Sequence, residues 1–300
     1  MFVFLNGKII AEESAVVSIF DRGFLYGDGL FETLRVVNGQ PFRWAQHVER
    51  LQHGADFLKI KLPFAPAVLR GFAAELIAKN QMPDSLLRLT LSRGVGVRGY
   101  SPKGAEQPTL VMTLHPAPGT PASGAARWSP SFSLSGDTLK RELQLGWKLI
   151  TSSLRLPAGD PIARFKTANK LAQILARAEA DAAGADEALL LDTSGHIAET
   201  SGGNLFWIER GAVCTPPLAA GILPGVTRAV VLELCRQLDL PVSETNILPT
   251  QLRAADGVFV SLSTLGVVEV VALDGVKLNV AAQVATIRQA YEKLLRAETS

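Results

Sequence analysis

The sequence predicts an α+β fold made of two domains. Its 300 residues exceed the usual length of a single domain. Short apolar runs separated by Asn-Gly pairs open the chain, and such pairs are typical of antiparallel hairpins. The stretch that follows His115 is rich in Pro, Gly, Ala and Ser and has no apolar period, which is typical of a linker. We therefore expect an N-terminal α+β domain at residues 1–115, a linker at 116–126, and a C-terminal α+β domain at 127–300.

The N-terminal domain is expected to hold a mostly antiparallel sheet. Asn6-Gly7 supplies the positive φ of a tight turn between two short strands, and Asn38-Gly39 does the same between two more. Apolar residues at helical spacing predict a helix over Ala45–Leu58, and a second helix is expected over Pro66–Lys79. The expected strands are Phe2–Leu5, Lys8–Ile10, Leu30–Val37, Pro41–Arg43, Leu86–Ser92 and Thr109–Leu114.

The C-terminal domain is expected to mix strands with three helices. The helices are expected over Thr167–Ala183, over Thr227–Leu238 after a Pro-Gly turn, and over Ala282–Leu295. The strands Ala188–Asp192 and His196–Glu199 are expected to pair as a hairpin across the Ser194-Gly195 turn. The expected strands are Lys148–Ser152, Ala188–Asp192, His196–Glu199, Asn204–Glu209, Ala212–Thr215, Gly257–Leu262 and Val267–Leu273.

Composition excludes several classes of function. The chain has 30 Lys and Arg against 28 Asp and Glu, a balance that argues against a nucleic-acid partner. Apolar residues make up 47% of the chain, which excludes a disordered protein, and no apolar run is long enough to cross a membrane. The N-terminus lacks the pattern of a signal peptide, and Cys214 and Cys235 form neither a disulfide framework nor a metal-ligand cluster. We expect a cytoplasmic protein with no metal, no nucleic-acid partner and no membrane partner.

A glycine-rich segment follows the strand that ends at Ser92. Gly94, Gly96 and Gly99 match the spacing of dinucleotide-binding loops, but the helix that such a loop requires does not follow. Guanidinium groups beside mobile glycines suit the recognition of carboxylates, although a solvated hairpin loop explains the spacing equally well. We expect loop movement to bring Arg98 to a substrate carboxylate. The arginines on or beside the segment are Arg88, Arg93 and Arg98.

Two further segments could bind a phosphate. The Pro224-Gly225 turn opens a long helix, so the amides of Val226 and Thr227 are donors without partners inside that helix. An ordinary helix start accounts for this pattern as often. A buried strand ends at Ser263-Thr264, which offers two hydroxyls, although a plain turn is the simpler interpretation.

A lysine and a glutamate complete the candidate chemistry. Lys166 lies between an apolar residue and the expected helix start, where desolvation and the helix dipole would both lower its pKa. Glu199 ends a hairpin strand just before two glycines that allow close approach of the backbone. A lysine nucleophile, a carboxylate and a phosphate cup are the parts of a pyridoxal-phosphate site. Each residue taken alone is more often a surface charge.

Five motifs in this order resemble the fold-type IV pyridoxal-phosphate enzymes. This family includes branched-chain and D-amino-acid aminotransferases, (R)-amine transaminases and aminodeoxychorismate lyase. The resemblance runs from about Asn6 to Asp274. It implies that the cofactor lies at the interface between the two domains and that the protein is a homodimer. The motifs are Tyr26-Gly27-Asp28-Gly29-Leu30-Phe31-Glu32, His47-Val48-Glu49-Arg50-Leu51, Lys166-Thr167-Ala168-Asn169, Glu199-Thr200-Ser201-Gly202-Gly203-Asn204-Leu205-Phe206 and Leu223-Pro224-Gly225-Val226-Thr227-Arg228.

The resemblance implies a role for each matching residue. It implies that Lys166 forms the internal aldimine with pyridoxal 5'-phosphate and shuttles a proton, and that Glu199 keeps the pyridine nitrogen protonated. It implies that Arg50 binds the phosphate, together with the amides of Val226 and Thr227 and the hydroxyls of Ser263 and Thr264. The residues implied to contact substrate are Tyr26, Phe31, Arg35 and Arg88, to which the glycine-rich loop adds Arg98.

The resemblance predicts a transaminase that moves an amino group between an amino acid or amine and a 2-oxo acid. Aminodeoxychorismate lyase is the alternative, because Ser92–Ser101 looks much like the corresponding stretch of those lyases, whereas Thr167 and Lys170 fit them less well. A non-catalytic phosphate- or carboxylate-binding module is a further alternative. Such a module would need neither a Schiff-base lysine nor an electron sink.

Overall fold

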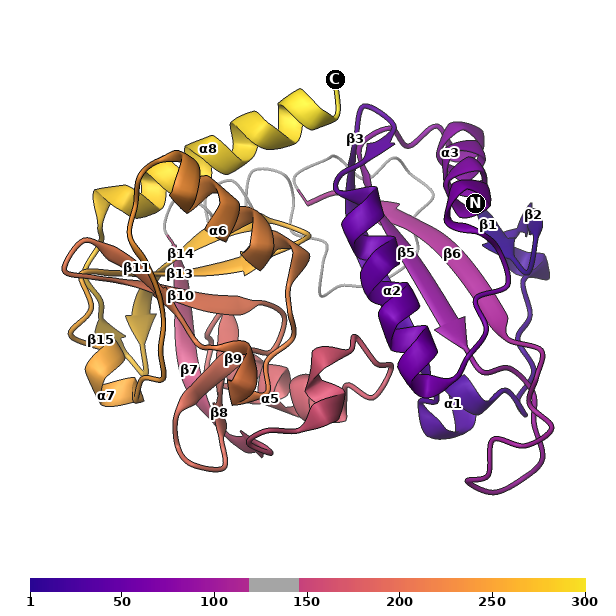
Figure 1. The fold of residues 1–300 in the computed structure, drawn as a ribbon, viewed down its shortest axis with the longest axis horizontal. Helices are drawn as coiled ribbons and strands as arrows, with labels where there is room; N and C mark the ends of the chain where they lie inside the picture. Colours follow the sequence, from indigo (N-terminus) through magenta and orange to yellow (C-terminus); the bar gives the residue numbers. More distant parts are fainter. Residues whose placement is uncertain (119–145) are drawn as a thin grey trace. The chain divides into compact units, whose positions relative to one another are not determined.

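A computed structural model describes residues 1–118 and 146–300, which form two compact α+β units (Figure 1). Unit 1 contains residues 1–118, Phe165–Asn169 and Arg296–Ser300. Unit 2 contains residues 146–164 and Lys170–Leu295. The predicted α+β class is confirmed.

Within the described residues, six strands form the antiparallel sheet of unit 1 in the order β2-β1-β6-β5-β3-β4. Both expected hairpins are confirmed, and Asn6 and Asn38 have φ of 48° and 50° in their turns. This positive φ explains why each turn carries Asn followed by Gly. The strand bounds are Phe2–Leu5 (β1), Lys8–Ala11 (β2), Gly29–Val37 (β3), Gln40–Pro41 (β4), Ser85–Ser92 (β5) and Thr109–Pro116 (β6).

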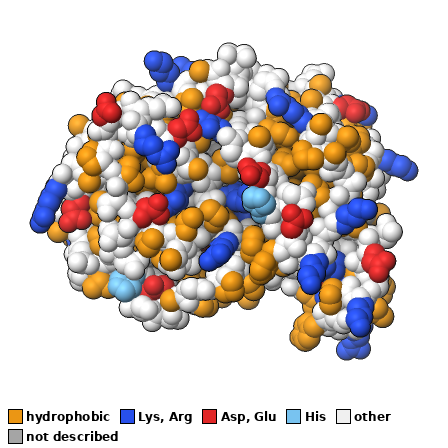
Figure 2. Space-filling model, in the orientation of Figure 1, with side chains coloured by type: hydrophobic (Ala, Val, Ile, Leu, Met, Phe, Trp, Pro, Cys, Tyr) orange, Lys and Arg blue, Asp and Glu red, His pale blue; other side chains and the backbone are white. Residues whose placement is uncertain are grey.

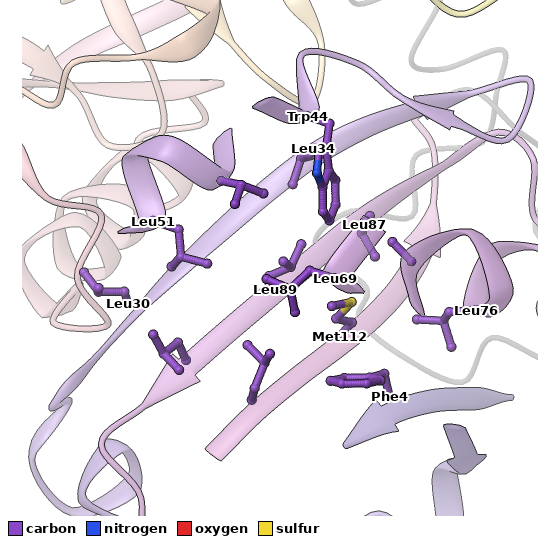
Figure 3. Packing of buried hydrophobic residues seen from close by; sticks show 14 of the residues in the cluster. Phe4, Leu30, Leu34, Trp44, Leu51, Leu69, Leu76, Leu87, Leu89 and Met112 are labelled. Atoms are coloured by element: carbon purple, nitrogen blue, oxygen red, sulfur yellow. The ribbon is translucent and has the colours of Figure 1, made fainter. Parts of the chain in front are cut away.

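Helices α2 (Trp44–Leu58) and α3 (Pro66–Asn80) pack on one face of this sheet and confirm the two predicted helices. A short helix α1 (Arg22–Tyr26), which the apolar pattern did not predict, begins where the Asp21 side chain accepts a hydrogen bond from the Gly23 amide. Apolar side chains of the sheet and of both long helices form one core (Figure 3). Fully buried members include Phe4, Leu34, Leu69, Leu87, Leu89 and Met112.

Unit 2 is built on a mixed sheet whose strand order in the described residues is β12-β11-β10-β13-β14-β7-β8-β9, with β15 paired to β14. The β11–β12, β14–β7 and β7–β8 pairs are parallel, and the remaining neighbours are antiparallel. The bounds are Trp147–Leu156 (β7), Glu187–Asp192 (β8), Ile197–Thr200 (β9), Asn204–Glu209 (β10), Ala212–Thr215 (β11), Val242–Glu244 (β12), Gly257–Leu262 (β13), Gly266–Leu273 (β14) and Val276–Lys277 (β15).

The helices of unit 2 are α5 (Leu171–Ala182), α6 (Val226–Gln237), α7 (Pro249–Leu252) and most of α8 (Ala282–Glu298). Ala176 and Ala180 of α5 pack against β8. The helix expected to begin at Thr167 begins at Leu171, so that prediction was wrong at its start. The physical reason is that the backbone of residues 166–168 pairs with β3, so these residues cannot form helical hydrogen bonds.

The predicted domain boundaries stay a prediction. Residues 119–126 of the expected linker lie outside the described residues, and Pro116 is the last residue of β6. The sequence placed Lys166 in the C-terminal domain, whereas Phe165–Asn169 belongs to unit 1. The chain end also packs there, because Arg43 forms an ion pair with Glu298 at 2.8 Å.

Acidic and basic side chains are interspersed on the face of the molecule that Figure 2 shows. This distribution agrees with the nearly balanced charge of the sequence. Among the described residues, no helix combines the length and the apolar character needed to span a membrane.

Candidate active site

A buried ion pair lies between β3 and α2. Glu32 is 1% exposed, and its two carboxylate oxygens accept hydrogen bonds from Nε and Nη2 of Arg50, each at 2.7 Å. His47 donates to the same carboxylate from Nδ1 at 2.7 Å. His47 and Arg50 lie one helical turn apart on α2 and therefore face the same strand. The contact holds the guanidinium of Arg50, the predicted phosphate ligand, by two points.

The charges of this cluster follow from burial and pairing. Burial alone would raise the pKa of Glu32, but the charge of Arg50 and the hydrogen bonds from His47 and Arg50 bring that pKa to about 2. Burial lowers the pKa of His47 and outweighs the opposite effect of Glu32. At neutral pH the carboxylate is therefore charged and the imidazole is neutral.

The opposite face of β3 carries a second group of predicted residues. Side chains alternate along the strand, so Phe31 and Arg35 lie on the half-exposed face while Glu32 points into the core. The guanidinium carbon of Arg88 lies 4.0 Å from the centre of the Phe31 ring, and Nζ of Lys166 lies 4.7 Å from it. The structure thus brings Phe31, Arg88 and Lys166 together.

Lys166 reaches this face because its backbone extends the sheet. The Phe31 amide donates to the Lys166 carbonyl at 2.9 Å, and the Ala168 amide donates to the Gly29 carbonyl at 2.8 Å. The expectation that a helix begins directly beside Lys166 was wrong, because α5 begins five residues later. Lys166 is half-buried beside an aromatic ring instead.

Arg88 differs from the other arginines near the glycine-rich loop. In the part of the chain that the structure describes, no carboxylate pairs with it, and burial lowers its pKa. By contrast, Arg93 is buried and donates from Nε and Nη2 to Asp28, at 2.7 and 3.0 Å. Arg98 is exposed and has no hydrogen bond or ion pair among the described residues. The structure therefore gives Arg93 a structural role and does not bring Arg98 to the Phe31 face.

The loop is attached to α1 rather than detached from the domain. The Arg22 guanidinium donates to the carbonyls of Gly99, Tyr100 and Ser101, and the Tyr26 hydroxyl accepts from the Gly99 amide. Tyr26 thus contacts the loop, and its ring lies near that of Tyr100.

Gly94 is required both by its positive φ and by the close approach of the backbone at Gln107. Its φ is 85°, and a Cβ there would lie 1.8 Å from the Gln107 carbonyl oxygen. At Gly94, loop mobility is therefore not needed to explain why the residue is a glycine.

Unit 2 holds the remaining predicted residues. Glu199 accepts hydrogen bonds from the Leu223 amide at 3.1 Å and from the Asn204 side chain at 3.4 Å. The same Asn204 amide group donates to the Leu223 carbonyl at 2.9 Å. Gly225 packs against Asn204, because a Cβ at Gly225 would lie 2.1 Å from its Oδ1. Asn204 therefore joins the carboxylate of Glu199 to the turn before α6.

The start of α6 gathers amides and hydroxyls. The helix begins at Val226, as expected to within one residue, and Gly225 at its N-cap has no side chain to satisfy the first amides. The hydroxyl of Thr227 lies 3.3 Å from that of Ser263, and Thr264 follows it in the chain. The donors that a phosphate requires are thus concentrated at one helix N-terminus.

Several residues of these clusters had no role predicted from the sequence: Arg22, Asp28, Glu32, His47 and Asn204. Glu32 could have been found, because it is the one charged residue on the apolar face of β3. A charge among alternating core positions indicates a buried partner. The other four depend on contacts distant in the sequence.

Comparison with known proteins decides the family. The description of the matching family model is amino-transferase class IV, and the match covers residues 29–273. The chain belongs to this family. The prediction from its five motifs is confirmed, and the chain is an enzyme of this class.

Two class IV relatives differ in their named activities. A candidate branched-chain-amino-acid aminotransferase of Methanocaldococcus jannaschii is 34% identical over 280 residues, which is 93% of this chain and 90% of that protein. The aminodeoxychorismate lyase of Vibrio harveyi is 33% identical over 254 residues, covering 85% of this chain and 86% of the lyase.

A class IV aminotransferase of known structure has the same fold. A T.th. branched-chain amino acid aminotransferase, complexed with N-(5'-phosphopyridoxyl)-L-glutamate, matches with a TM-score of 0.85 at 27% identity. The match covers 99% of this chain and 94% of that structure. Members of this family use pyridoxal phosphate, and the ligand of that complex joins such a cofactor to an amino acid.

Acid should destabilise the protein through Glu32. Its folded-state pKa of about 2 lies below its ordinary 4.5, so its stabilising effect is complete above pH 4.5 and is lost as the pH falls toward 2. Glu32→Gln leaves Arg50 without this carboxylate and should cost about 3 kcal/mol at pH 7. Urea unfolding of both proteins at pH 7, 4 and 3 should show this difference shrinking below pH 4.5. A constant difference down to pH 3 would contradict the ion pair.

Proposed function

We propose that this class IV enzyme is a pyridoxal 5'-phosphate-dependent transaminase that moves an amino group between an amino acid or amine and a 2-oxo acid. One observation carries the proposal: Lys166 and Arg88 flank the same Phe31 ring on one face of β3. An amine beside a guanidinium that no carboxylate neutralises within residues 1–118 and 146–300 suits a substrate that brings both an amino group and a carboxylate.

The residues present suit the cofactor. Arg50 would bind its phosphate with a guanidinium that Glu32 already holds in one plane. The amides of Val226 and Thr227 and the hydroxyls of Thr227, Ser263 and Thr264 would supply neutral hydrogen bonds to the phosphate.

Glu199 would hold the proton on the pyridine nitrogen. Hydrogen bonds from Leu223 and Asn204 orient its carboxylate for that role. When bound, pyridoxal phosphate supplies a ring that withdraws electrons from the carbon that loses its proton.

The chain's own groups then perform the transfer. Nζ of Lys166 would hold the cofactor covalently until the donor amine takes its place. The amine of Lys166 released in that exchange would then accept the proton from the amino-bearing carbon of the donor and give it back later in the reaction. Arg88 binds the substrate carboxylate, with Arg35 and Tyr26 as further substrate contacts. Phe31 keeps water from the amine of Lys166.

The lyase alternative is supported by the Vibrio harveyi relative, whose identity is nearly as high. That match covers less of this chain than the aminotransferase match, 85% against 93%, which favours the transaminase. Incubation with a panel of L- and D-amino acids and 2-oxo acids tests the transaminase. Release of pyruvate from aminodeoxychorismate without any amino transfer would assign the lyase activity.

Replacing Lys166 should abolish the covalent link to the cofactor. The protein incubated with pyridoxal phosphate and reduced with borohydride should gain one cofactor mass, and Lys166→Ala should gain none. Lys170→Ala is the matched control, since Lys170 is the nearest other lysine, and it should be labelled as the wild type is. Labelling of Lys166→Ala at another lysine would overturn the assignment.

Replacing Arg88 should weaken substrate binding and leave the cofactor in place. Arg88→Ala loses a charge-assisted contact and should raise KM for 2-oxo acids about tenfold or more, with unchanged cofactor absorbance. Arg98→Ala should raise KM for a dicarboxylate such as 2-oxoglutarate more than for monocarboxylates. Arg70→Ala, an exposed arginine of α3, is the control and should change neither. An unchanged KM in Arg88→Ala would remove it from the site.

We propose further that the protein is a cytoplasmic homodimer. Both cysteines are free and buried, which suits a reducing compartment. Around α1 lies a group of exposed apolar side chains, which we name the α1 patch, and such patches mark protein interfaces. Val95 is continuous with it, because it forms a bridge with Asp21. The members of the α1 patch are Val16, Val17, Ile19, Phe20, Phe24, Leu25, Val95 and Val97.

A charge in the α1 patch should dissociate the dimer. Phe24 is 75% exposed, so Phe24→Asp should leave the unit folded and remove apolar contact between copies. Sedimentation should show a dimer for the wild type and a monomer for this variant. Val280→Asp is the control, since Val280 is 60% exposed in unit 2, and it should remain a dimer. A wild-type monomer would contradict the proposal.

A further inference from the structure

We propose that Asp28 and Arg22 are positioning residues that hold the Gly99–Ser101 segment, and with it the adjacent Arg98, in a fixed place beside α1. The structure thereby makes this loop an anchored platform for substrate recognition. The anchoring is independent of the proposed function, and only its effect on substrate binding rests on that function.

The contact between Arg22 and the loop uses most of one guanidinium. Nη1 donates to the carbonyls of Gly99 at 2.8 Å and Ser101 at 3.2 Å, and Nη2 donates to the Tyr100 carbonyl at 3.1 Å. Three successive carbonyls thus converge on one cation. A rigid, planar donor set of this kind fixes both the place and the curvature of the backbone.

Asp28 keeps the Arg22 guanidinium in position. Its Oδ2 accepts from Nε of Arg22 at 2.8 Å, and the same oxygen accepts from Nε of Arg93 at 2.7 Å. Arg93 in turn donates to the carbonyls of Leu58 and Lys59 at the end of α2. One carboxylate therefore connects the loop, through two arginines, to the rigid core of unit 1.

Burying the charge of Arg22 costs desolvation free energy that a solvated loop would not require. Arg22 is only 4% exposed, and Asp28 and the backbone carbonyls replace the water that its guanidinium has lost. Burial would raise the pKa of Asp28, but the hydrogen bonds from Arg93 and Arg22 lower it, so the carboxylate stays charged at neutral pH. Backbone contacts reinforce the attachment, since the Arg22 amide donates to the Gly94 carbonyl at 2.8 Å.

The chemistry of the loop indicates that it can bind a carboxylate of the substrate. Arg98 directly precedes the anchored segment, is exposed, and has no acidic partner among the described residues. A guanidinium on an anchored backbone loses less conformational entropy when it binds a carboxylate than one on a mobile loop. Asp28 and Arg22 would therefore tune affinity for acceptors with a second carboxylate without touching the substrate.

Hydrogen exchange measured by mass spectrometry tests the anchor on the intact protein. Asp28→Asn and Arg22→Lys should each speed amide exchange in peptides covering residues 97–103 by about tenfold or more. Each variant weakens the charged hydrogen bonds that hold the Gly99–Ser101 segment, so this segment should open more often. Peptides of unit 2 should not change. Arg228→Lys is the matched control, since Arg228 is also a buried arginine that binds a carboxylate and a backbone carbonyl. It should leave exchange at residues 97–103 as in the wild type.

Unchanged exchange at residues 97–103 in both Arg22→Lys and Asp28→Asn would overturn the anchor. If Asp28→Asn fails to fold, Arg22→Lys decides, because it keeps the charge and loses only the forked geometry.

The kinetic arm separates positioning from stability. Asp28→Asn should raise KM for 2-oxoglutarate about threefold or more while kcat changes little, and it should have no further effect in an Arg98→Ala background. Equal losses with and without Arg98 would contradict the positioning role. A protein that takes up no pyridoxal phosphate would refute the proposed function and leave the exchange result intact.

Discussion

The placement of Lys166 depends on two backbone hydrogen bonds. They join residues 166–168 to the start of β3 and give that strand an extra neighbour beside Gly29 and Phe31. An unpaired buried amide is costly, so the edge of β3 and the short segment satisfy each other. The amine of Lys166 is thereby fixed to a sheet whose other strands come from the first 118 residues.

The same strand separates two tasks by its alternation. Glu32 points into the core and fixes Arg50, whereas Phe31 points outward and supports Arg88 and Lys166. A shift of β3 by one residue would exchange the two faces and bury the aromatic ring in place of the carboxylate. The register with β5, which pairs Glu32 with Leu89, is therefore a functional constraint as well as a packing one.

Local signals in the sequence predicted most helices, strands and turns. Contacts between residues distant in the sequence explain the elements and site residues that were not predicted. The turns at Asn6 and Asn38 and the start of α6 follow from short-range chemistry, and the structure has them as predicted. The start of α5 was misplaced because apolar spacing favours a helix, and only the edge of β3 prevents one at residues 166–168. Candidate residues were chosen by type and motif, but motifs do not say which acceptor a side chain meets. The roles assigned to Lys166 and Glu199 therefore stay predictions that chemistry must test.

Four arginines of unit 1 show why residue type alone does not assign a role. Arg22 and Arg93 both donate to Asp28, and their other N–H groups donate to backbone carbonyls, so these two arginines stabilise the fold. Arg98 keeps its charge in solvent. Arg88 lies on the Phe31 ring, and this cation–π contact contributes roughly 0.5–2 kcal/mol, while no described carboxylate compensates the charge. A half-buried guanidinium in that state gains more from an arriving carboxylate than a solvated or paired one does, because part of its desolvation has already occurred. Of these four arginines, Arg88 is therefore the one whose surroundings favour binding of an anionic substrate.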